Sequence, residues 1–214
     1  MLHEQHLTVG AAFCALGLVL GTLAAQERDP KEYARFLESR ERVERMEVAR
    51  VVEALHLQPG WSVADLGSGS GLFTRALARA VAPGGTAYAV DIDPDLLKIV
   101  EASAKRSELT NIQTVLAGSD DPKLPQPVDL VFICDTFHHL PDKAAYARTL
   151  FGYVKPGGRV AVIDFTNDWP GGHDAMRYTP ADLEGWMTAA GFKRDESFDF
   201  PKNSFYVTYK KAAQ

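Results

Sequence analysis

The chain of 214 residues is poor in cysteine, which narrows the classes of protein it can belong to. Its two cysteines are Cys14, in an apolar N-terminal segment, and Cys134, in a predicted buried strand. They are placed too differently to pair, so we expect no disulfide framework. No cluster of Cys and His has the spacing of zinc ligands, and the sequence therefore predicts no metal site.

An excess of positive charge is also absent. The formal net charge is -5, from 23 Lys and Arg against 28 Asp and Glu. Proteins that bind nucleic acids normally present a basic face to the phosphates, so we expect no nucleic-acid partner. The chain also lacks internal repeats and low-complexity tracts. Its length fits one domain with an appendage.

The N-terminal residues lack the charge pattern of a typical signal peptide. Residues 7–25 contain no charged side chain, and no Lys or Arg precedes Arg28. Cleavage near Ala25 would make them a signal peptide, a short membrane anchor is a second interpretation, and a buried core helix is a third. Because all nearby Lys and Arg follow the segment, the positive-inside rule favours an anchor with the rest of the chain facing the cytoplasm. Export after cleavage is the alternative.

The most informative motif is at residues 63–74, where the sequence reads Val-Ala-Asp-Leu-Gly-Ser-Gly-Ser-Gly-Leu-Phe-Thr. An apolar run ends at Asp65, three alternating glycines follow at Gly67, Gly69 and Gly71, and an amphipathic helix begins. A strand, a glycine turn and a helix form the first half of a nucleotide-binding βαβ unit. The glycines allow the backbone to approach a ligand, and the helix N-terminus offers unpaired N–H groups.

This motif lacks the last glycine of the dinucleotide pattern Gly-x-Gly-x-x-Gly, since Leu72 stands at that position. An acid just before the glycines also suits an ammonium group better than a pyrophosphate. The motif therefore favours a nucleoside that carries an amino acid. It resembles motif I of the class I S-adenosylmethionine-dependent methyltransferases, which implies S-adenosyl-L-methionine as the cofactor.

Alternating strand and helix patterns predict an α/β fold with a doubly wound, largely parallel sheet. The expected strands are 61–66, 86–90, 112–116, 128–134, 159–165, 193–198 and 204–210, and the expected helices are 30–57, 71–81, a helix starting at 94, 143–154 and a helix starting at 180. The resemblance covers about residues 30–210. It implies a Rossmann-like sheet of seven strands in the order 3-2-1-4-5-7-6, with strand 7 antiparallel.

These patterns divide the chain into three parts. Residues 1–25 form the signal peptide or anchor, residues 26–60 a helical cap, and residues 61–214 the methyltransferase domain that binds the cofactor. The charged run Ser-Arg-Glu-Arg-Val-Glu-Arg in the cap is interpreted as a solvated face.

The resemblance also assigns cofactor contacts, at the carboxyl ends of the strands. Gly67, Ser68, Gly69 and Gly71 are expected to hold the methionine part, with Asp65 accepting from its amino group. Asp91 would accept from the ribose hydroxyls, and Ile92 would pack against the adenine. Asp93 is a competing candidate for the ribose, although Pro94 after it predicts that it caps a helix. Asp120 is expected at the adenine amino group, with Asp121 as the alternative register.

The acceptor is expected near residues 135–140, where the sequence reads Asp-Thr-Phe-His-His-Leu. Asp135 is assigned to the cofactor site. His138 and His139 resemble the His-His of small-molecule methyltransferases, where a histidine near neutral pKa can act as a general base. In the alternative, one histidine orients the loop and the other packs. Metal-dependent relatives carry an Asp-Asn pair after the fifth strand, but Phe165 follows Asp164 here.

The sequence therefore predicts a methyltransferase that acts on a small-molecule acceptor, which the motifs do not name. Two alternatives remain open at this point. One is a nicotinamide-dependent oxidoreductase, against which Leu72 argues. The other is a catalytically silent module that binds S-adenosylmethionine.

Overall fold

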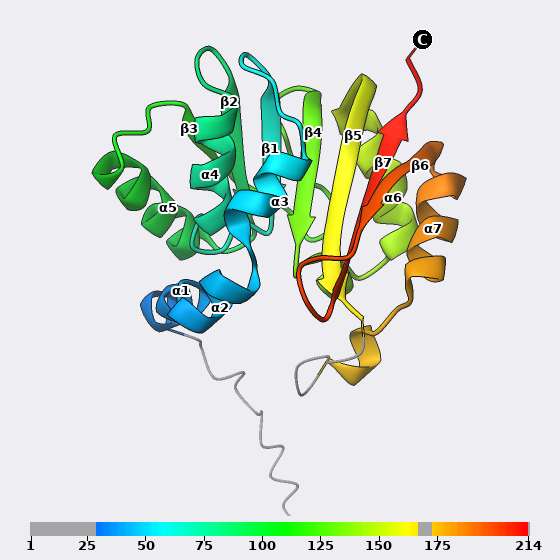
Figure 1. Cartoon of the computed structure of the whole chain (residues 1–214), viewed down its shortest axis with the longest axis horizontal. Coiled ribbons are helices and arrows are strands. Elements are labelled where there is room, and N and C mark those ends of the chain that lie inside the picture. Colours follow the sequence, from blue (N-terminus) through cyan, green and yellow to red (C-terminus); the bar gives the residue numbers. More distant parts are fainter. Residues whose placement is uncertain (1–28, 167–172, 214) are drawn as a thin grey trace, which may run out of the picture.

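A seven-stranded sheet runs through the centre of the molecule (Figure 1). The computed structural model describes residues 29–166 and 173–213. The strands are β1 (Ser62–Leu66), β2 (Thr86–Asp91), β3 (Ile112–Leu116), β4 (Val128–Cys134), β5 (Val154–Phe165), β6 (Phe192–Phe198) and β7 (Ser204–Lys211). Their order is β3-β2-β1-β4-β5-β7-β6, and β7 runs antiparallel to both of its neighbours. The predicted fold class, strand order and antiparallel strand 7 are confirmed.

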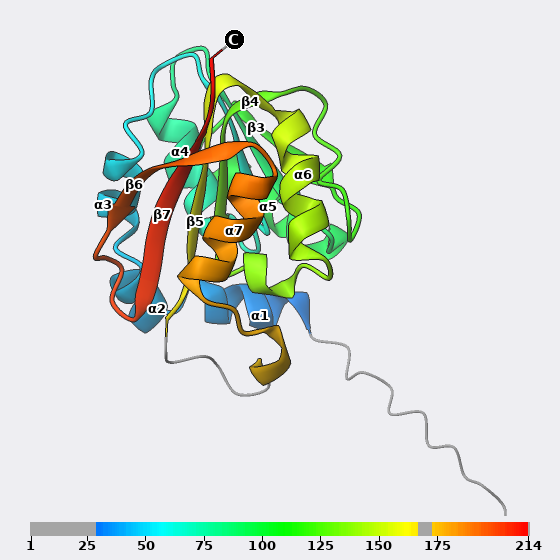
Figure 2. The same cartoon turned by 90° about the vertical axis from the view of Figure 1, so that its right-hand side faces the viewer.

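Helices cover both faces of this sheet. The α-helices are α1 (Pro30–Leu37), α2 (Arg40–Arg45), α3 (Val48–Ala54), α4 (Leu72–Ala80), α5 (Pro94–Arg106), α6 (Lys143–Tyr153) and α7 (Pro180–Ala189). Two short 3-10 helices, η1 (Phe137–His139) and η2 (Asp174–Met176), lie in loops. Figure 2 shows α3 on one side of the sheet and α6 with α7 on the other.

The two faces follow from the alternation of side chains along each strand. In β1, Val63 belongs to a core cluster with Phe73 of α4, whereas its neighbour Ala64 belongs to a second cluster with Tyr146 of α6. All five residues of β1 are buried. Burial on both faces also explains why β4 reads as a near-continuous apolar run, as expected for a parallel sheet covered on both sides.

The prediction of one helix over residues 30–57 is wrong, because the segment forms three short helices. The Ser39 side chain accepts from the Arg42 N–H at 3.4 Å and starts α2, and Glu47 has a φ of 44°, which breaks the chain again before α3. Of these helices, α3 contributes Val51 to the core cluster that also contains Val63 and Phe73, and Met46 at the end of α2 belongs to the same cluster. Helices α1 and α2 lie beyond the carboxyl ends of the parallel strands (Figure 1).

Other boundaries are close to the expected ones. Asp93 caps α5, since its carboxylate accepts from the backbone of Asp95 at 2.8 Å. Strand β5 begins at Val154, five residues before the expected 159, so the Pro156-Gly157-Gly158 turn lies within the strand. Among the described residues, no helix combines the length and the apolar character needed to cross a membrane. The apolar segment 7–25 lies outside the described residues.

Candidate functional site

A cavity of about 880 Å³ opens at the carboxyl ends of β1, β2 and β4, where α1 and α2 cover it. Nearly all of the predicted site residues line it. These are Asp65, Gly67, Ser68, Gly69, Asp91, Ile92, Asp135, His138 and His139. Of the predicted residues, Gly71 and Asp120 are not part of the lining.

The three glycines of the turn between β1 and α4 contact different parts of the structure. All three have positive φ, at 75°, 52° and 79° for Gly67, Gly69 and Gly71. A Cβ on Gly67 would lie 2.2 Å from the Thr136 hydroxyl oxygen, so Gly67 permits close contact with the loop after β4. Gly71 occupies the N-cap of α4 and faces Val100 of α5. It therefore fixes the start of the helix, whereas Gly69 faces the cavity.

Asp91 holds this glycine turn in place. One of its carboxylate oxygens accepts from the Gly69 N–H at 2.8 Å, and the other accepts from the Asp93 N–H at 3.0 Å. Burial raises its pKa, while these N–H bonds oppose the rise. Next to it, Ile92 is 67% exposed, an uncommon position for a large apolar side chain that lines a cavity. The pair thus offers an acceptor and an apolar surface side by side.

Asp65 is buried at the end of β1, beside the turn. Its carboxyl group accepts from the Thr74 hydroxyl at 2.5 Å, a partner that the sequence analysis did not identify. Burial raises the pKa of Asp65 to about 7, and the nearby charge of Asp91 adds to the rise. A cation bound in the cavity would therefore favour ionisation of Asp65.

Two polar atoms of the cavity lining are buried without a hydrogen-bond partner in the described structure. They are the Ser68 hydroxyl oxygen and Oδ1 of Asp135. Buried polar atoms are almost always paired, and orphaned ones at a cavity indicate where a ligand supplies the partner. A polar ligand of the kind implied by the glycine turn therefore fits these residues.

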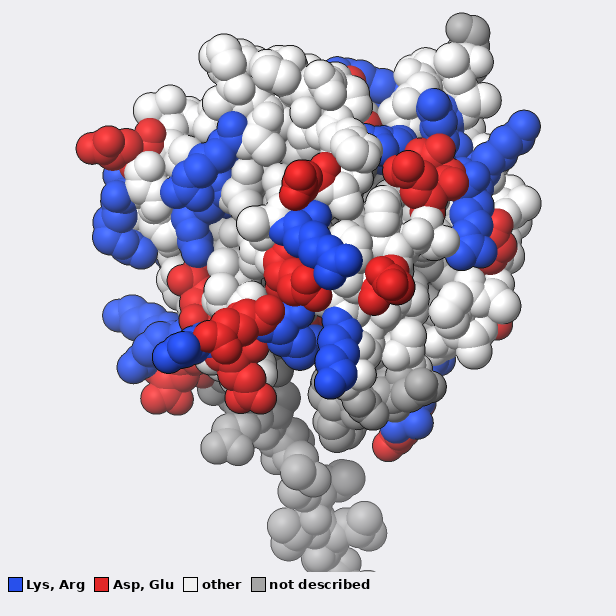
Figure 3. Space-filling model, viewed as in Figure 1, with Lys and Arg blue, Asp and Glu red and all other residues white. Residues whose placement is uncertain are grey.

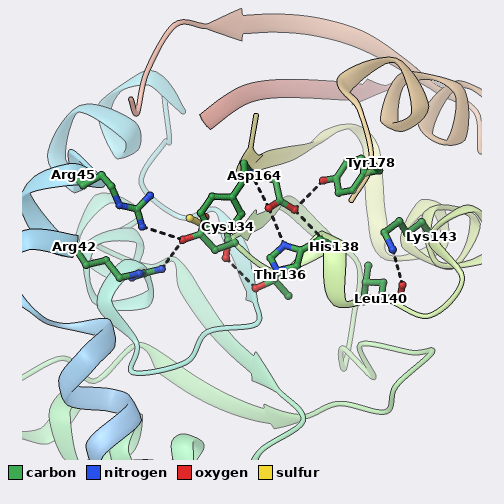
Figure 4. A network of polar contacts seen from close by, with 11 residues as sticks. Arg42, Arg45, Cys134, Thr136, His138, Leu140, Lys143, Asp164 and Tyr178 are labelled. Carbon is green, nitrogen blue, oxygen red and sulfur yellow. Dashed lines mark hydrogen bonds and ion pairs between the residues drawn. The ribbon is translucent and has the colours of Figure 1, made fainter. Parts of the chain in front are cut away.

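Asp135 is also the meeting point of two arginines from the cap. Its Oδ2 lies 3.0 Å from Arg42 Nη2 and 3.7 Å from Arg45 Nη2. Figure 4 shows both arginines on the side of the network opposite Tyr178. The interpretation of this charged run as a solvated face is thus wrong for Arg42 and Arg45, although Arg40 and Glu44 pair on the surface. The pairs join the cap to the loop after β4.

The surface over the cap carries both signs of charge. Figure 3 shows basic and acidic side chains interspersed over α1 and α2. Arg50 pairs with Glu47, and Arg75 of α4 pairs with Glu38 after α1. These neighbouring pairs leave no block of one sign over this part of the face.

His138 is anchored by a carboxyl group that the sequence analysis did not connect with it. His138 is 2% exposed, and its Nδ1 lies 2.8 Å from Oδ1 of the fully buried Asp164. The same carboxyl group accepts from the Tyr178 hydroxyl at 2.9 Å and from the Phe165 N–H at 3.0 Å (Figure 4). A lone acid in the apolar run of β5 was the available signal, since a buried acid needs partners.

A third histidine joins the predicted pair. His173 lies against His138 and His139, with ring centroids 5.2 Å and 5.3 Å away. The spacing of histidines along the chain does not indicate this cluster, because the fold brings His173 to the loop after β4.

The predicted adenine contact at Asp120 is not reproduced by the cavity. Asp120 is exposed, and Asp121 accepts from the Tyr153 hydroxyl at 2.8 Å and from the Lys123 N–H at 2.7 Å. Gly118 and Ser119 line the cavity instead. The backbone there bends back through a bond from the Gly118 N–H to the Asp121 carbonyl, and neither acid is part of the cavity lining.

The glycine turn gives a first testable prediction. Gly69→Val should abolish cofactor binding, because Gly69 faces the cavity and its Cβ would lie 2.6 Å from Leu37. The φ of 52° also strains a β-branched residue, by roughly 1–2 kcal/mol. Gly60→Val is the matched control, since Gly60 has a φ of 86° with no atom within 4 Å of a Cβ. Calorimetric titration with the cofactor should show loss of binding in Gly69→Val and normal binding in Gly60→Val. Equal affinity in the two variants would contradict the assignment of Gly69 to the cofactor site.

Comparison with known proteins identifies the type of domain. Residues 63–158 match the family model described as a methyltransferase domain. The chain is 30% identical over 124 residues to a ubiquinone/menaquinone biosynthesis C-methyltransferase from Burkholderia vietnamiensis, over 56% of this chain and 50% of that protein. It is 31% identical over 124 residues to a protein-L-isoaspartate O-methyltransferase from Aeropyrum pernix, over 56% and 45% of the two chains. The chain thus spans about half the length of these curated relatives.

Solved structures agree on the fold. A SAM-dependent methyltransferase from Aquifex aeolicus superposes with a TM-score of 0.76 at 23% identity, over 86% of this chain and 99% of that one. At this level of identity the likeness concerns the fold. It extends the match beyond residues 63–158 to most of the chain.

Proposed function

We propose that this chain, in which residues 63–158 match a methyltransferase domain, transfers a methyl group from S-adenosylmethionine to a small-molecule acceptor. The observation that carries the proposal is the cavity beside the glycine turn. Its lining includes the buried, unpartnered oxygens of Ser68 and Asp135 and the carboxylate of Asp91.

The residues of the cavity fit the parts of this cofactor. The turn at Gly67–Gly69 accommodates the methionine part, and Asp65 is positioned to accept from the ammonium group. Asp91 can accept from the ribose hydroxyls, while the exposed Ile92 offers a surface for the adenine. Bound there, the cofactor supplies a methyl group already activated on a sulfonium. The chain's contribution is therefore to position both reactants and to exclude water.

A small acceptor is supported by the aromatic side chains that line the cavity. Tyr33 and Phe36 of α1 stack with ring centroids 6.3 Å apart, and both line the cavity with Phe165 and His139. Aromatic side chains in the lining suit a compact, partly apolar molecule. A relative that acts in quinone biosynthesis agrees with such an acceptor.

The proposal is tested by measuring S-adenosylhomocysteine formation with a panel of phenols, quinols, thiols and amines. We expect formation of the product with at least one small molecule, and slower formation in Asp91→Ala at a cofactor concentration that does not saturate the variant. Turnover of a nicotinamide cofactor instead would overturn the proposal, as would methylation of proteins only.

The raised pKa of Asp65 gives a prediction for pH. Its carboxyl group has a pKa of about 7 in the folded protein and an ordinary pKa of 3.8 in the unfolded chain, so without ligand the free energy of unfolding should fall as the pH rises from about 4 to 7. An ammonium group bound beside it favours the ionised form. Cofactor binding at pH 6 should therefore release protons, and affinity should rise from pH 5.5 to 7.

Calorimetry in two buffers of different ionisation enthalpy measures this proton release. Asp65→Asn is the matched control, because it keeps the shape of the side chain and removes the titrating group. We expect the release in the wild type and none in the variant. Equal release in both would show that another group titrates.

We further propose that residues 7–25 tether the domain to a membrane, with residues 29–213 facing the cytoplasm. The absence of Lys and Arg before the segment and their abundance after it support this orientation. It would also keep the domain where S-adenosylmethionine is made. Protease protection on spheroplasts tests the proposal: the domain should resist external protease. Digestion from outside, or a mature N-terminus near Gln26, would contradict it.

A further inference from the structure

Three imidazoles from two distant parts of the chain meet at one wall of the cavity. His138 and His139 are adjacent in η1, and His173 precedes η2. One ligand-capable nitrogen from each can be chosen so that all three atoms lie within 4.8 Å of one another. The His138 and His139 ring centroids are 4.0 Å apart, and all three residues line the cavity.

The buried member of this cluster is oriented as metal ligands are. Nδ1 of His138 faces the carboxyl group of Asp164, so the nitrogen that a metal would take is Nε2. Histidines that bind metals commonly donate their other ring N–H to a carboxylate, which fixes the tautomer and the ring orientation. Asp164 is held in turn by the Tyr178 hydroxyl and by backbone N–H groups, so it cannot swing away.

We propose that His138, His139 and His173 bind one divalent cation of the zinc class. Imidazole suits Zn²⁺, Cu²⁺, Fe²⁺ and Ni²⁺ rather than Mg²⁺ or Ca²⁺. In a tetrahedral zinc site with Zn–N bonds of about 2.0–2.1 Å, the nitrogens lie about 3.4 Å apart. The three ligand atoms lie within 4.8 Å of one another in the structure, so they must move closer together to bind zinc. Rotation of the exposed His139 and the partly buried His173 would bring their nitrogens toward His138.

The geometry also indicates the kind of site. The three histidine ligands found among the described residues leave a fourth position of the metal, and the cavity lies beside the three rings. Structural zinc sites are closed by four protein ligands, whereas catalytic sites keep one position open. An open position within the acceptor cavity would receive an oxygen or a sulfur atom of a small molecule.

The role of the metal rests on the proposed function. An acceptor O–H or S–H bound to the cation loses its proton to water more readily, since the cation stabilises the anion. A lone pair of that anion then forms the new bond to the methyl carbon. The carbon–sulfur bond of the sulfonium breaks, and its electron pair stays on sulfur to give neutral S-adenosylhomocysteine. The site thereby assigns the acceptor to the hydroxyl and thiol class.

Zinc binding can be measured directly, without any acceptor. The metal-free full-length protein is titrated with Zn²⁺, followed by calorimetry and by the metal content after gel filtration. We expect one zinc per chain, and His139→Ala and His173→Ala should each lower the affinity by roughly tenfold or more. Asp164→Asn should lower it about 10–100-fold, as loss of an outer carboxylate does.

The matched control is His56→Ala, because His56 is an exposed histidine outside the cavity. This variant should bind zinc with the affinity of the wild type. Co²⁺ in place of Zn²⁺ should give the intense visible absorption of a tetrahedral site, and this signal should disappear in His173→Ala. Failure to retain zinc in folded wild-type protein would overturn the proposal. Equal zinc affinity in His56→Ala, His139→Ala and His173→Ala would overturn it as well.

The same samples separate this proposal from the proposed function. S-adenosylhomocysteine binding is titrated in the wild type and in His139→Ala, with and without zinc. If the protein binds S-adenosylhomocysteine but not zinc, the proposed methyl transfer is retained and the proposed metal site is rejected. If the protein binds zinc but not S-adenosylhomocysteine, the proposed metal site is retained and the proposed methyl transfer is rejected.

Discussion

Replacement of Asp91 by Ala is expected to weaken binding of S-adenosylmethionine by about 1.5–3 kcal/mol, or roughly 10- to 150-fold in Kd. The carboxylate is buried at the end of β2 and faces the cavity. Its removal takes away the expected acceptor for the ribose hydroxyls. It also frees the Gly69 N–H, so the glycine turn loses the bond that holds its shape. Calorimetric titration with S-adenosylhomocysteine measures the change in Kd.

Asp93→Ala is the matched control for this variant. Asp93 lies two residues away and caps α5, accepting from the backbone of Asp95 and Leu96. Its loss should cost about 0.5–2 kcal/mol of unfolding free energy and leave the Kd nearly unchanged. If Asp93→Ala abolished binding while Asp91→Ala did not, the two assignments would be reversed.

Replacement of Asp164 by Ala should lower the free energy of unfolding by about 3–5 kcal/mol, the range found when a buried polar or ionic partner is removed. Its carboxyl group is fully buried. Four nitrogen or oxygen atoms, which belong to three residues, form hydrogen bonds with it. They are His138 N, His138 Nδ1, the Phe165 N–H and the Tyr178 hydroxyl. Without the carboxyl group these buried atoms lose their acceptor.

Urea unfolding followed by circular dichroism measures this loss. Tyr178→Phe is the comparison, because it removes one of the bonds and leaves the carboxyl group in place, with an expected cost of about 1–2 kcal/mol. A change below about 1 kcal/mol in Asp164→Ala would mean that water readily replaces the carboxyl group. His138 would then be held less rigidly than its contacts with Asp164 indicate.

The sheet could be predicted from the sequence because its signals are local. The near-continuous apolar run at residues 128–134 coincides with β4, and the strand expected at residues 112–116 coincides with β3. The cap at Asp93 and the capping box at Thr179 mark helix starts by side chains that act within the next three residues. The strand order came from the family resemblance, since the motifs alone allow more than one arrangement of parallel strands.

The cap could not be predicted in the same way. The segment 30–57 has helix-forming residues throughout, and the breaks near Ser39 and Glu47 are set by packing as well as by local preference. Arg42 and Arg45 read as surface residues because their partner, Asp135, is distant in sequence. A side chain in a charged run turns inward only where the fold supplies a buried acid.

The candidate site shows the same division between local and distant contacts. Asp65, Asp91 and the glycine turn were identified because the motif places them within one βαβ unit. The contact of His138 with Asp164, and the approach of His173, depend on how β4, β5 and the loop before α7 meet at one edge of the sheet. Asp120 is not part of the cavity lining, and the bend after β3 that leaves Gly118 and Ser119 there could not be read from the sequence.

The most direct test of the whole account is calorimetric titration of the folded protein with S-adenosylhomocysteine, paired with a thermal melt on the same sample. We expect binding of one molecule per chain at micromolar Kd, a raised melting temperature, and loss of both effects in Gly69→Val but not in Gly60→Val. No heat and no shift in melting temperature, for protein shown to be folded, would contradict it.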